Sequence, residues 1–287
     1  MLSTQYVDFA HWQRRWPHHA ALREQLAYWK RQLRGPLRPL ALLADRPRRG
    51  DRLPGTARLA FEFPRPLTDA LTALSHREGA TLFMTVVAAF AVLVHGETGA
   101  EDVRVATFLA NRQRRETEGV IGLFADLAIL RTDLAGNPTG REVVRRVRAT
   151  TLEAYAHQEF PFAELVEGLA RERGVPRTAL SQVMVIWQNA FRLNPRLAEP
   201  PLRFLEMDQT GLGPEAIVTT FDIILELRER PQGLMGSCLY NALVFEGPTV
   251  RRLLQDFRSV LETIAAHPEQ PVAVFGALRG AIPSSGQ

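Results

Sequence analysis

The chain has 287 residues, of which 46% are hydrophobic and 23% charged, which is typical of a globular protein long enough to bury a core without disulfide staples. A single cysteine, Cys238, excludes a disulfide framework and fits a reducing, cytoplasmic compartment. The net charge is +4, but the basic residues are scattered among 31 acids and no basic run alternates with aromatic residues, so we expect no nucleic-acid partner.

The N-terminal part of the chain predicts a helical lead-in over 1–34 with a break at Pro17. Apolar side chains recur there at helical spacing: Leu22, Leu26, Trp29 and Leu33. The lead-in lacks the continuous apolar segment of a secretory signal. Residues 35–56 are rich in Pro, Gly and Arg and predict an irregular connector.

The chain beyond the connector predicts an α/β core over 57–275 and a flexible tail over 276–287. Strand patterns cover 56–63, 102–109, the chain after Phe124, 182–188, and a hairpin of 221–229 with 234–242. Helical patterns cover 67–78, 82–95, 139–155 and 249–266. We therefore expect an α/β (α+β) layered sandwich, and the hairpin argues against a purely parallel sheet.

Two of these helices carry further expectations. The apolar run 82–94 is shorter than the roughly 20 residues that span a bilayer, so we expect a buried helix and no membrane partner. In the helix over 139–155, Arg141, Arg145 and Arg148 lie off the apolar stripe. We expect the four arginines of this helix to form a solvated face, and an acidic partner is the alternative.

The histidines are the obvious catalytic candidates, but their surroundings favour structural roles. His18 and His19 are adjacent, yet no acid or cysteine follows at the spacing of a metal site, so we expect no metal. His76, His95 and His267 end helices, where a cation complements the dipole, and His11 lies among aromatic residues. The sequence has no phosphate-cradling glycine loop and no Gly-x-Ser-x-Gly elbow. These patterns alone indicate no catalysis.

Four ordered motifs carry a resemblance to a known family. They are YVDFAHW (6–12), IGLFADLAILRTDL (121–134), HQEFPF (157–162) and RTALSQVMVIWQN (177–189). Further matches lie at 78–107, 110–112 and 221–241. From Gln5 to about Ile264 the chain resembles the condensation domains of nonribosomal peptide synthetases, which make natural products including antibiotics. The resemblance implies a lobe like chloramphenicol acetyltransferase, with a mixed β-sheet and flanking helices.

The family's active-site motif, His-His-x-x-x-Asp-Gly, is missing from this sequence. His18-His19 is followed by residues 20–24 without an Asp-Gly pair, and no Asp-Gly occurs anywhere in the chain. In the family that motif belongs to the N-terminal of two lobes. The resemblance therefore implies a C-terminal lobe that has no catalytic residue of its own and is inactive alone. With an N-terminal lobe it would form amides, or esters, between acyl groups on carrier proteins.

The resemblance implies that no cofactor is bound directly and that the substrates are tethered to phosphopantetheine on carrier proteins. It also implies roles for particular residues. Residues for the substrate tunnel and positioning are Asn111, Arg112, Gly122, Phe124, Asp126, Arg131, Gln188 and Asn189. Residues with a structural role are Tyr6, Asp8, Trp12, His157, Gln158, Pro161, Phe162 and Arg177. We expect Pro161 to start a helix that Phe162 anchors, and His157 to bond to the backbone.

Asp126 stands where the family usually has Asn. A buried carboxylate needs a partner or must be neutralised, and Arg112 and Arg131 are the candidate partners. We hypothesise a variant channel at Asp126, and drift at a tolerant polar position is the alternative.

Two alternatives to the split enzyme stay open. One is a non-catalytic module that binds a carrier protein or a tailoring enzyme. The other is an acetyltransferase-like enzyme that oligomerises to rebuild a tunnel. A solitary lobe exposes apolar surface, so we expect self-association or a stable partner, and 205–220 is the candidate crossover onto the other lobe.

Overall fold

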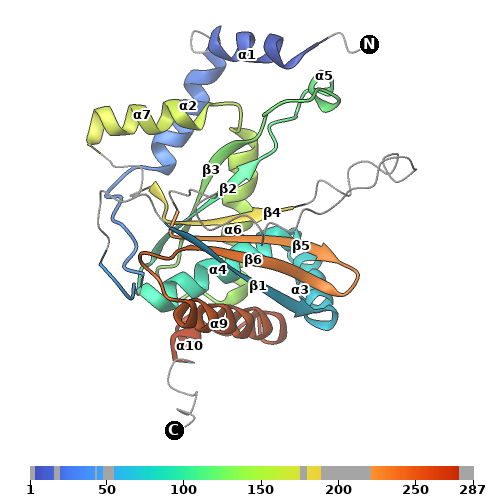
Figure 1. The fold of residues 1–287 in the computed structure, drawn as a ribbon, viewed down its shortest axis with the longest axis vertical. Helices are drawn as coiled ribbons and strands as arrows, with labels where there is room; N and C mark the ends of the chain where they lie inside the picture. The colour runs from blue at the N-terminus through green and yellow to red at the C-terminus, as the bar shows by residue number, and fades with distance from the viewer. Residues whose placement is uncertain are drawn as a thin grey trace.

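The computed structural model describes residues 4–15, 20–42, 44–47, 55–174, 180–188 and 221–277. Its centre is a six-stranded sheet in the order β1-β6-β5-β4-β2-β3 (Figure 1). The strands are β1 (Thr56–Pro64), β2 (Asp102–Leu109), β3 (Asp126–Asp133), β4 (Val183–Trp187), β5 (Ile223–Arg230) and β6 (Gly233–Asn241). Each predicted strand is confirmed within a few residues of its expected ends.

The sheet is mixed, as the hairpin predicted. β4 runs parallel to β2 and β5, while the other neighbouring strands are antiparallel. The β5–β6 hairpin closes at Gly233, whose φ of 142° and whose approach to the Phe63 carbonyl oxygen leave no room for a side chain. β2 and β4 pair only at Val105–Val183 and Ala106–Met184, so the β2–β3 pair is joined weakly to the other four strands.

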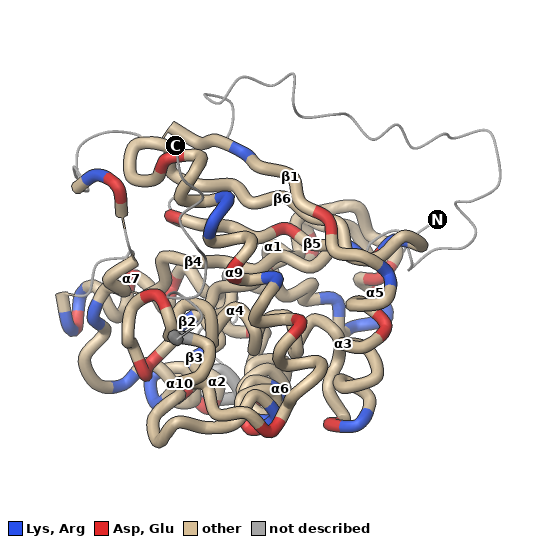
Figure 2. The backbone as a smooth tube through the Cα atoms, turned by 90° about the horizontal axis from the view of Figure 1, so that it is seen from below, with Lys and Arg blue, Asp and Glu red and all other residues tan. Residues whose placement is uncertain are grey.

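Helices cover one side of this sheet and extend beyond its end. They are α1 (Tyr6–Arg15), α2 (Ala20–Gln32), α3 (Arg65–Arg77), α4 (Leu82–Thr98), α5 (Arg115–Glu118), α6 (Gly140–Ala156), α7 (Phe162–Arg173), α9 (Gly247–Ala266) and α10 (Ala273–Ala277). Figure 2 shows β1, β6 and β5 on one side of α9, α4 and α3, with basic and acidic residues intermixed along the chain. The predicted layered α/β sandwich is confirmed.

Helix α4 is the centre of the core. Its side chains are buried almost all round, because the 82–95 run carries apolar residues on every face. Thr81 accepts a hydrogen bond from the Met84 backbone N–H and begins the helix, as the sequence predicted. Among the described helices, none is by itself long and apolar enough to cross a membrane. Taken together, α3 and α4 have the length and composition to do so, but they bend by 102° at their junction.

Helix α9 packs its predicted stripe against α4 and the sheet. The stripe residues are all buried: Val250, Leu253, Leu254, Phe257, Leu261 and Ile264. Phe257 meets Phe90 of α4 and Phe63 of β1 at ring distances of 5.8 Å and 5.9 Å. These edge-on aromatic contacts join the two helices and the sheet into one core.

The arginines of α6 lie on a solvent-exposed face, as expected, and also pair within the chain. Glu78, at the end of α3, lies 3.2 Å from the Arg141 guanidinium and 2.7 Å from that of Arg145. Arg148 Nε donates to the Gly79 carbonyl oxygen at 2.7 Å. Although Arg145 stays half exposed, the three side chains bind the C-terminal end of α3, where cations complement the helix dipole.

The connector and the tail are described only in part. Leu40 and Leu42 of the connector are buried, and the Leu40 N–H donates to the side chain of Gln182 at the start of β4. Helix α10 spans the boundary that the sequence predicted at residue 275. Pro17, His18, His19 and the candidate crossover 205–220 lie outside the described residues.

Candidate functional site

The predicted site residues centre on the chain that joins β2 to β3, residues 110–125, and on helix α1, which packs against it (Figure 1). The Tyr6 hydroxyl donates to the Leu123 carbonyl oxygen at 2.9 Å. The rings of Tyr6 and Phe9 lie 5.3 Å and 4.6 Å from that of Phe124. A Cβ on Gly122 would come within 2.3 Å of the Tyr6 ring, so glycine is required for this approach.

Arg112 organises the 110–125 connection from within. Its guanidinium donates to the carbonyl oxygen of Thr117, to that of Val120 at 2.8 Å and to that of Gly122 at 3.3 Å. It also lies over the Phe124 ring, 4.2 Å from the centroid. One arginine thus donates hydrogen bonds to three backbone carbonyl groups of a segment that has little secondary structure. Its guanidinium is therefore already bound by the backbone of this chain.

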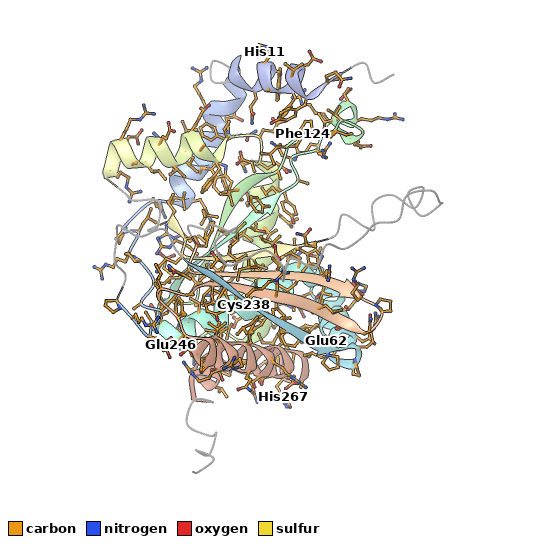
Figure 3. The ribbon with its side chains drawn as sticks, viewed as in Figure 1. His11, Glu62, Phe124, Cys238, Glu246 and His267 are labelled. Atoms are coloured by element: carbon orange, nitrogen blue, oxygen red, sulfur yellow. The ribbon has the colours of Figure 1, made fainter. Side chains whose placement is uncertain are left out.

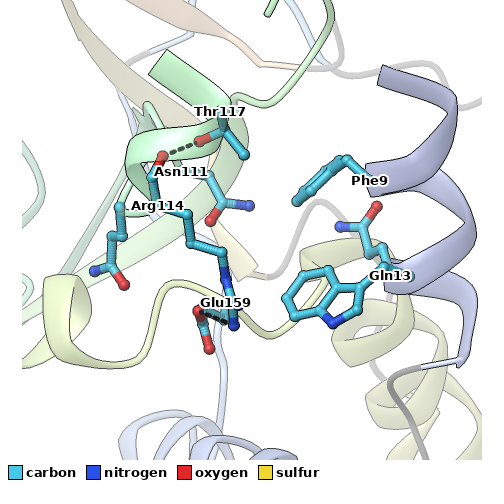
Figure 4. A pocket seen from close by; sticks show the side chains of 8 residues that line it. Phe9, Gln13, Asn111, Arg114, Thr117 and Glu159 are labelled. Atoms are coloured by element: carbon cyan, nitrogen blue, oxygen red, sulfur yellow. Dashed lines mark hydrogen bonds and ion pairs between the residues drawn. The ribbon is translucent and has the colours of Figure 1, made fainter. Parts of the chain in front are cut away.

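Asn111 borders a small pocket under α1 (Figure 4). The pocket is lined by Phe9, Trp12, Gln13, Asn111, Gln113, Arg114, Thr117 and Glu159. Its volume, about 10 Å³, holds no more than one water molecule. Arg114 bridges its two sides, 4.4 Å from the Trp12 ring and 3.6 Å from Glu159. Asn111 has a left-handed φ of 50°, which asparagine tolerates better than most residues.

Asp126 binds backbone amides and not the predicted arginines. Its Oδ1 accepts from the Leu127 N–H at 2.8 Å, and its Oδ2 accepts from the Phe162 N–H at 3.0 Å. Phe162 is the first residue of α7, so the carboxylate occupies that helix N-terminus, where unpaired N–H groups favour a negative charge. The expectation that Arg112 or Arg131 neutralises Asp126 is wrong, because both guanidinium groups bind elsewhere.

Burial changes the pKa of Asp126. Desolvation raises the pKa of this carboxyl above its ordinary value of 3.8, and the two backbone hydrogen bonds only partly oppose the shift. The native state therefore binds the proton more tightly than the unfolded chain does. As pH rises from below 3.8 through the raised pKa, the folded protein loses the stability that the neutral carboxyl provides.

Replacing Asp126 with Asn tests this assignment. The amide cannot ionise, so the free energy of unfolding of the variant, relative to the wild type, is expected to rise as pH increases from about 3 to 7. Urea unfolding at several pH values measures the difference. Asp133→Asn, an exposed carboxylate at the other end of β3, is the control. A relative stability that falls with pH would show that the ionised form is the favoured one.

Arg131 lies apart from these residues, at the opposite end of β3. It forms a bidentate pair with Asp102 at 2.6 Å and 2.9 Å, and its Nη1 donates to the Gln32 and Arg34 carbonyl oxygens. It borders an open groove of about 760 Å³. The groove is lined by Tyr28, Arg31, Gln32, Arg34, Gly35, Asp102, Arg131, Asp133 and Glu153. Arg131 therefore ties the end of α2 to the sheet edge.

The HQEFPF segment links α6, α2 and α7. His157 Nδ1 lies 2.8 Å from the Glu153 carbonyl oxygen, and its ring stacks on Tyr28 at 4.0 Å. The His157 carbonyl oxygen accepts from Trp29 Nε1 at 2.9 Å. The backbone-directed bonding expected of His157 is confirmed.

The neighbours of His157 also make local contacts. Gln158 Nε2 donates to the Tyr155 carbonyl oxygen at 2.9 Å. Pro161 immediately precedes α7, which begins at Phe162, as predicted.

The remaining predicted residues are spread over the molecule. Asp8 accepts from the Gln5 N–H at 2.8 Å and so caps the start of α1. Gln188 is exposed just after β4, and its N–H donates to the Leu227 carbonyl oxygen at 2.8 Å. Asn189 and Arg177 lie outside the described residues. Within the described chain the structure brings together the α1, 110–126 and α7 residues, but not Arg131 or Gln188.

His95 and the single cysteine make contacts or are buried within the fold, whereas His11, His76 and His267 are exposed. His95 Nδ1 lies 2.9 Å from the Ala100 carbonyl oxygen. Figure 3 shows His11 and His267 at opposite ends of the molecule and Cys238 within the sheet. Burial raises the pKa of the Cys238 thiol to about 12, which suppresses the thiolate at neutral pH. In the described ranges no three His, Cys, Asp or Glu side chains are grouped to hold a metal ion.

Sequence reasoning missed two features of this region. Gln25 of α2 accepts from the Phe160 N–H at 2.9 Å through its side-chain oxygen, and thereby positions the HQEFPF segment. Ile121 and Leu123 are exposed although they stand in an apolar run. The glycines at 119 and 122, which interrupt that run, were the available signal that it begins as a loop and not as a strand.

Comparison with known proteins adds a family match. The family model for the condensation domain matches residues 1–279. Linear gramicidin synthase subunits D and B of Brevibacillus parabrevis are 39% and 42% identical to this chain over 97% and 95% of its length. The chain spans about 5% of the length of each of these relatives.

Solved structures agree in fold. The X-domain from teicoplanin biosynthesis has a TM-score of 0.79 at 24% identity, over 95% of this chain and 62% of that one. The SgcC5 protein from Streptomyces globisporus has a TM-score of 0.72 at 28% identity, over 93% and 61%. The chain therefore corresponds to somewhat less than two thirds of each of these solved chains.

Proposed function

The chain belongs to the condensation-domain family, and we propose that it is the C-terminal lobe of a nonribosomal peptide synthetase condensation domain. In this proposal it contributes one wall of the substrate tunnel and part of the carrier-protein surface for amide or ester formation. The observation that carries the proposal is the 39–42% identity to the linear gramicidin synthases over nearly the whole chain.

The face of the sheet that the helices leave uncovered suits a wall of the substrate tunnel. Along β1, Leu59 and Phe63 pack into the core beneath the helices, while the alternate residue Arg58 is exposed on the other face. On that face Arg58 lies 3.6 Å from Glu226, which also accepts from the Ser237 hydroxyl at 3.2 Å. This half-buried polar surface, without a helix over it in the described chain, supports a role facing a second polypeptide.

The reaction explains why an N-terminal lobe is needed. An amine attacks the thioester carbonyl carbon and loses a proton, and the developing oxyanion must be stabilised. The C–S bond then breaks and the phosphopantetheine sulfur leaves as the thiol, which takes up the proton. In the proposal the phosphopantetheine-tethered groups are substrates delivered by carrier proteins, and this chain orients them. Holding two tethered reactants in place lowers the barrier by several kcal/mol, about 7–11 kcal/mol in the best cases. The proton-transferring histidine comes from the N-terminal lobe.

A reconstitution assay tests the proposal. The chain is mixed with an N-terminal lobe bearing the His-His-x-x-x-Asp-Gly motif and with two loaded carrier proteins, and amide product is followed by mass spectrometry. Product in the full mixture, and none when either lobe is left out, is the expected result. A mixture with a folded, bound N-terminal lobe that yields no product would contradict the proposal.

A non-catalytic binding module is the second candidate. The specific observation in its favour is the likeness to the X-domain from teicoplanin biosynthesis, which has been solved in complex with OxyB. That structure matches this chain with a TM-score of 0.77 at 25% identity. By analogy, this lobe would hold a partner enzyme or a carrier protein without forming a bond. Tight binding of such a partner together with an inactive reconstituted mixture would select this candidate.

A further inference from the structure

Bulky apolar side chains are exposed at one end of the molecule. Val7 of α1, Phe108 near the end of β2, and Ile121 and Leu123 of the 110–125 connection are all exposed. Ile121 is 96% exposed and Leu123 is 76% exposed, whereas their neighbours Val120 and Phe124 are both 3% exposed. Elsewhere in the described chain the exposed large hydrophobic residues stand singly: Leu152, Leu243 and Val274.

Hydrogen bonds from two side chains hold the backbone around Ile121 and Leu123, which we call the apolar tip. The Arg112 guanidinium binds the carbonyl oxygens of Val120 and Gly122, on either side of Ile121. The Tyr6 hydroxyl binds the carbonyl oxygen of Leu123 itself. A segment that lacks regular secondary structure is thus fixed through three of its carbonyl groups close to the tip. Flexible loops do not need such bracing, whereas preorganised binding residues do.

We propose that the apolar tip is the anchor by which this chain docks onto the N-terminal lobe of a condensation domain, inserting Ile121 and Leu123 into an apolar depression on that lobe. The inference rests on the proposed function and adds the residues through which the two lobes recognise each other. Phe108, at the root of the same connection, and Val7, beside Tyr6, form the surrounding contact area.

Two observations select the lobe as the occupant. Permanent interfaces are more apolar than transient ones, and a carrier protein that must dock and leave at each cycle fits a polar surface better than an aliphatic one. This chain also covers only 62% and 61% of the two solved relatives, so each of those solved chains has a large part outside the matched region. The tip provides an apolar attachment point for that part.

The test measures binding of the full chain to a defined probe. The probe is the segment that precedes the matching region in the 42% identical linear gramicidin synthase, co-expressed with this chain as a separate polypeptide. That segment is expected to carry the His-His-x-x-x-Asp-Gly motif. The double substitution Ile121→Ser/Leu123→Ser is expected to weaken the complex by about 30-fold or more, because it removes the apolar surface that two aliphatic side chains would bury in the depression. Isothermal titration and sedimentation read out the affinity.

Leu243→Ser/Val274→Ser is the matched control, because it removes two exposed aliphatic side chains distant in sequence from the 110–125 connection. Its affinity is expected to stay within about threefold of the wild type, as for surface substitutions outside an interface. Both variants replace exposed side chains, and unfolding midpoints near that of the wild type verify that they fold.

The outcomes separate the inference from the proposed function. A wild-type complex that the tip substitution leaves intact overturns the inference and spares the proposed function. A wild-type chain that does not bind the probe overturns both. Self-association of the wild type that the tip substitution abolishes identifies a second copy as the occupant and overturns the inference.

Discussion

Replacing Trp29 with alanine is expected to lower the free energy of unfolding by about 3–5 kcal/mol, the usual range for removing a buried aromatic side chain. Trp29 is 2% exposed, and its indole Nε1 donates to the His157 carbonyl oxygen at 2.9 Å. The substitution therefore leaves both a cavity and an unsatisfied carbonyl where α2 meets the HQEFPF segment. Urea unfolding followed by circular dichroism measures the loss.

Two further variants, one at Trp29 and one at the next residue, separate the contribution of apolar packing from that of the indole hydrogen bond and of a neighbouring ion pair. Trp29→Phe keeps most of the apolar volume and removes the donor, so a loss of about 1–3 kcal/mol is expected. Lys30→Ala breaks only the exposed ion pair with Glu172, at 2.6 Å, and is expected to change stability by less than about 1 kcal/mol. Equal effects of Trp29→Ala and Lys30→Ala would show that α2 is not anchored through Trp29.

Replacing Arg112 with alanine is expected to lower the free energy of unfolding by about 2–3 kcal/mol, because hydrogen bonds from charged groups are among the stronger ones. Three carbonyl oxygens lose their donor, and the Phe124 ring loses the guanidinium above it. The 110–125 connection should then open locally. Hydrogen exchange of its backbone amides is expected to accelerate more than that of the β5–β6 hairpin.

The controls for Arg112 vary the geometry and the position. Arg112→Lys keeps the charge without the planar fork, so it should recover only part of the stability. Arg115→Ala removes an exposed arginine from α5 and is expected to change stability by less than about 0.5 kcal/mol. Full recovery with lysine would mean that charge alone, and not the forked geometry, holds the segment.

Much of the fold follows from local patterns in the sequence. The all-round apolar run at 82–95 and its Thr81 cap predict a buried helix, and α4 is that helix. The 3.6-residue stripe that ends in Ile264 predicts the buried face of α9. The strand pattern either side of the RPQG turn predicts the β5–β6 hairpin. Each of these signals depends on residues close together in the chain, which is why one sequence suffices.

The site is less predictable because its contacts join distant residues. Nothing in the sequence pairs Asp126 with the Phe162 N–H, 36 positions away. Charge alone predicted that Asp126 pairs with Arg112 or Arg131, but these arginines bind backbone carbonyl groups elsewhere. The same holds for Glu78, which gathers arginines from α6. Arginine has five donors and reaches far, so its partner is decided by packing and not by sequence spacing.

The contacts of Asp126 bear on the hypothesis of a variant channel. Its two oxygens are both occupied by backbone N–H groups, one of them at the start of α7. This bonding accounts for an acidic side chain at the position without any substrate. A local bonding role is therefore the simpler interpretation. It also distinguishes Asp from Asn, because an amide has one acceptor oxygen and could accept from only one of these two N–H groups.

The central claim is that the histidine that transfers the proton lies in the N-terminal lobe and not in this chain. Replacing histidines in each lobe of the reconstituted mixture tests it most directly. The rate of product formation is measured in the reconstituted mixture with the second histidine of the N-terminal lobe's motif replaced by alanine, and separately with His157→Gln in this chain. The first change is expected to lower the rate by about 100-fold or more, the scale of general acid–base catalysis, and the second to leave it within about threefold. Product from this chain alone, lost on His157→Gln, would contradict the account.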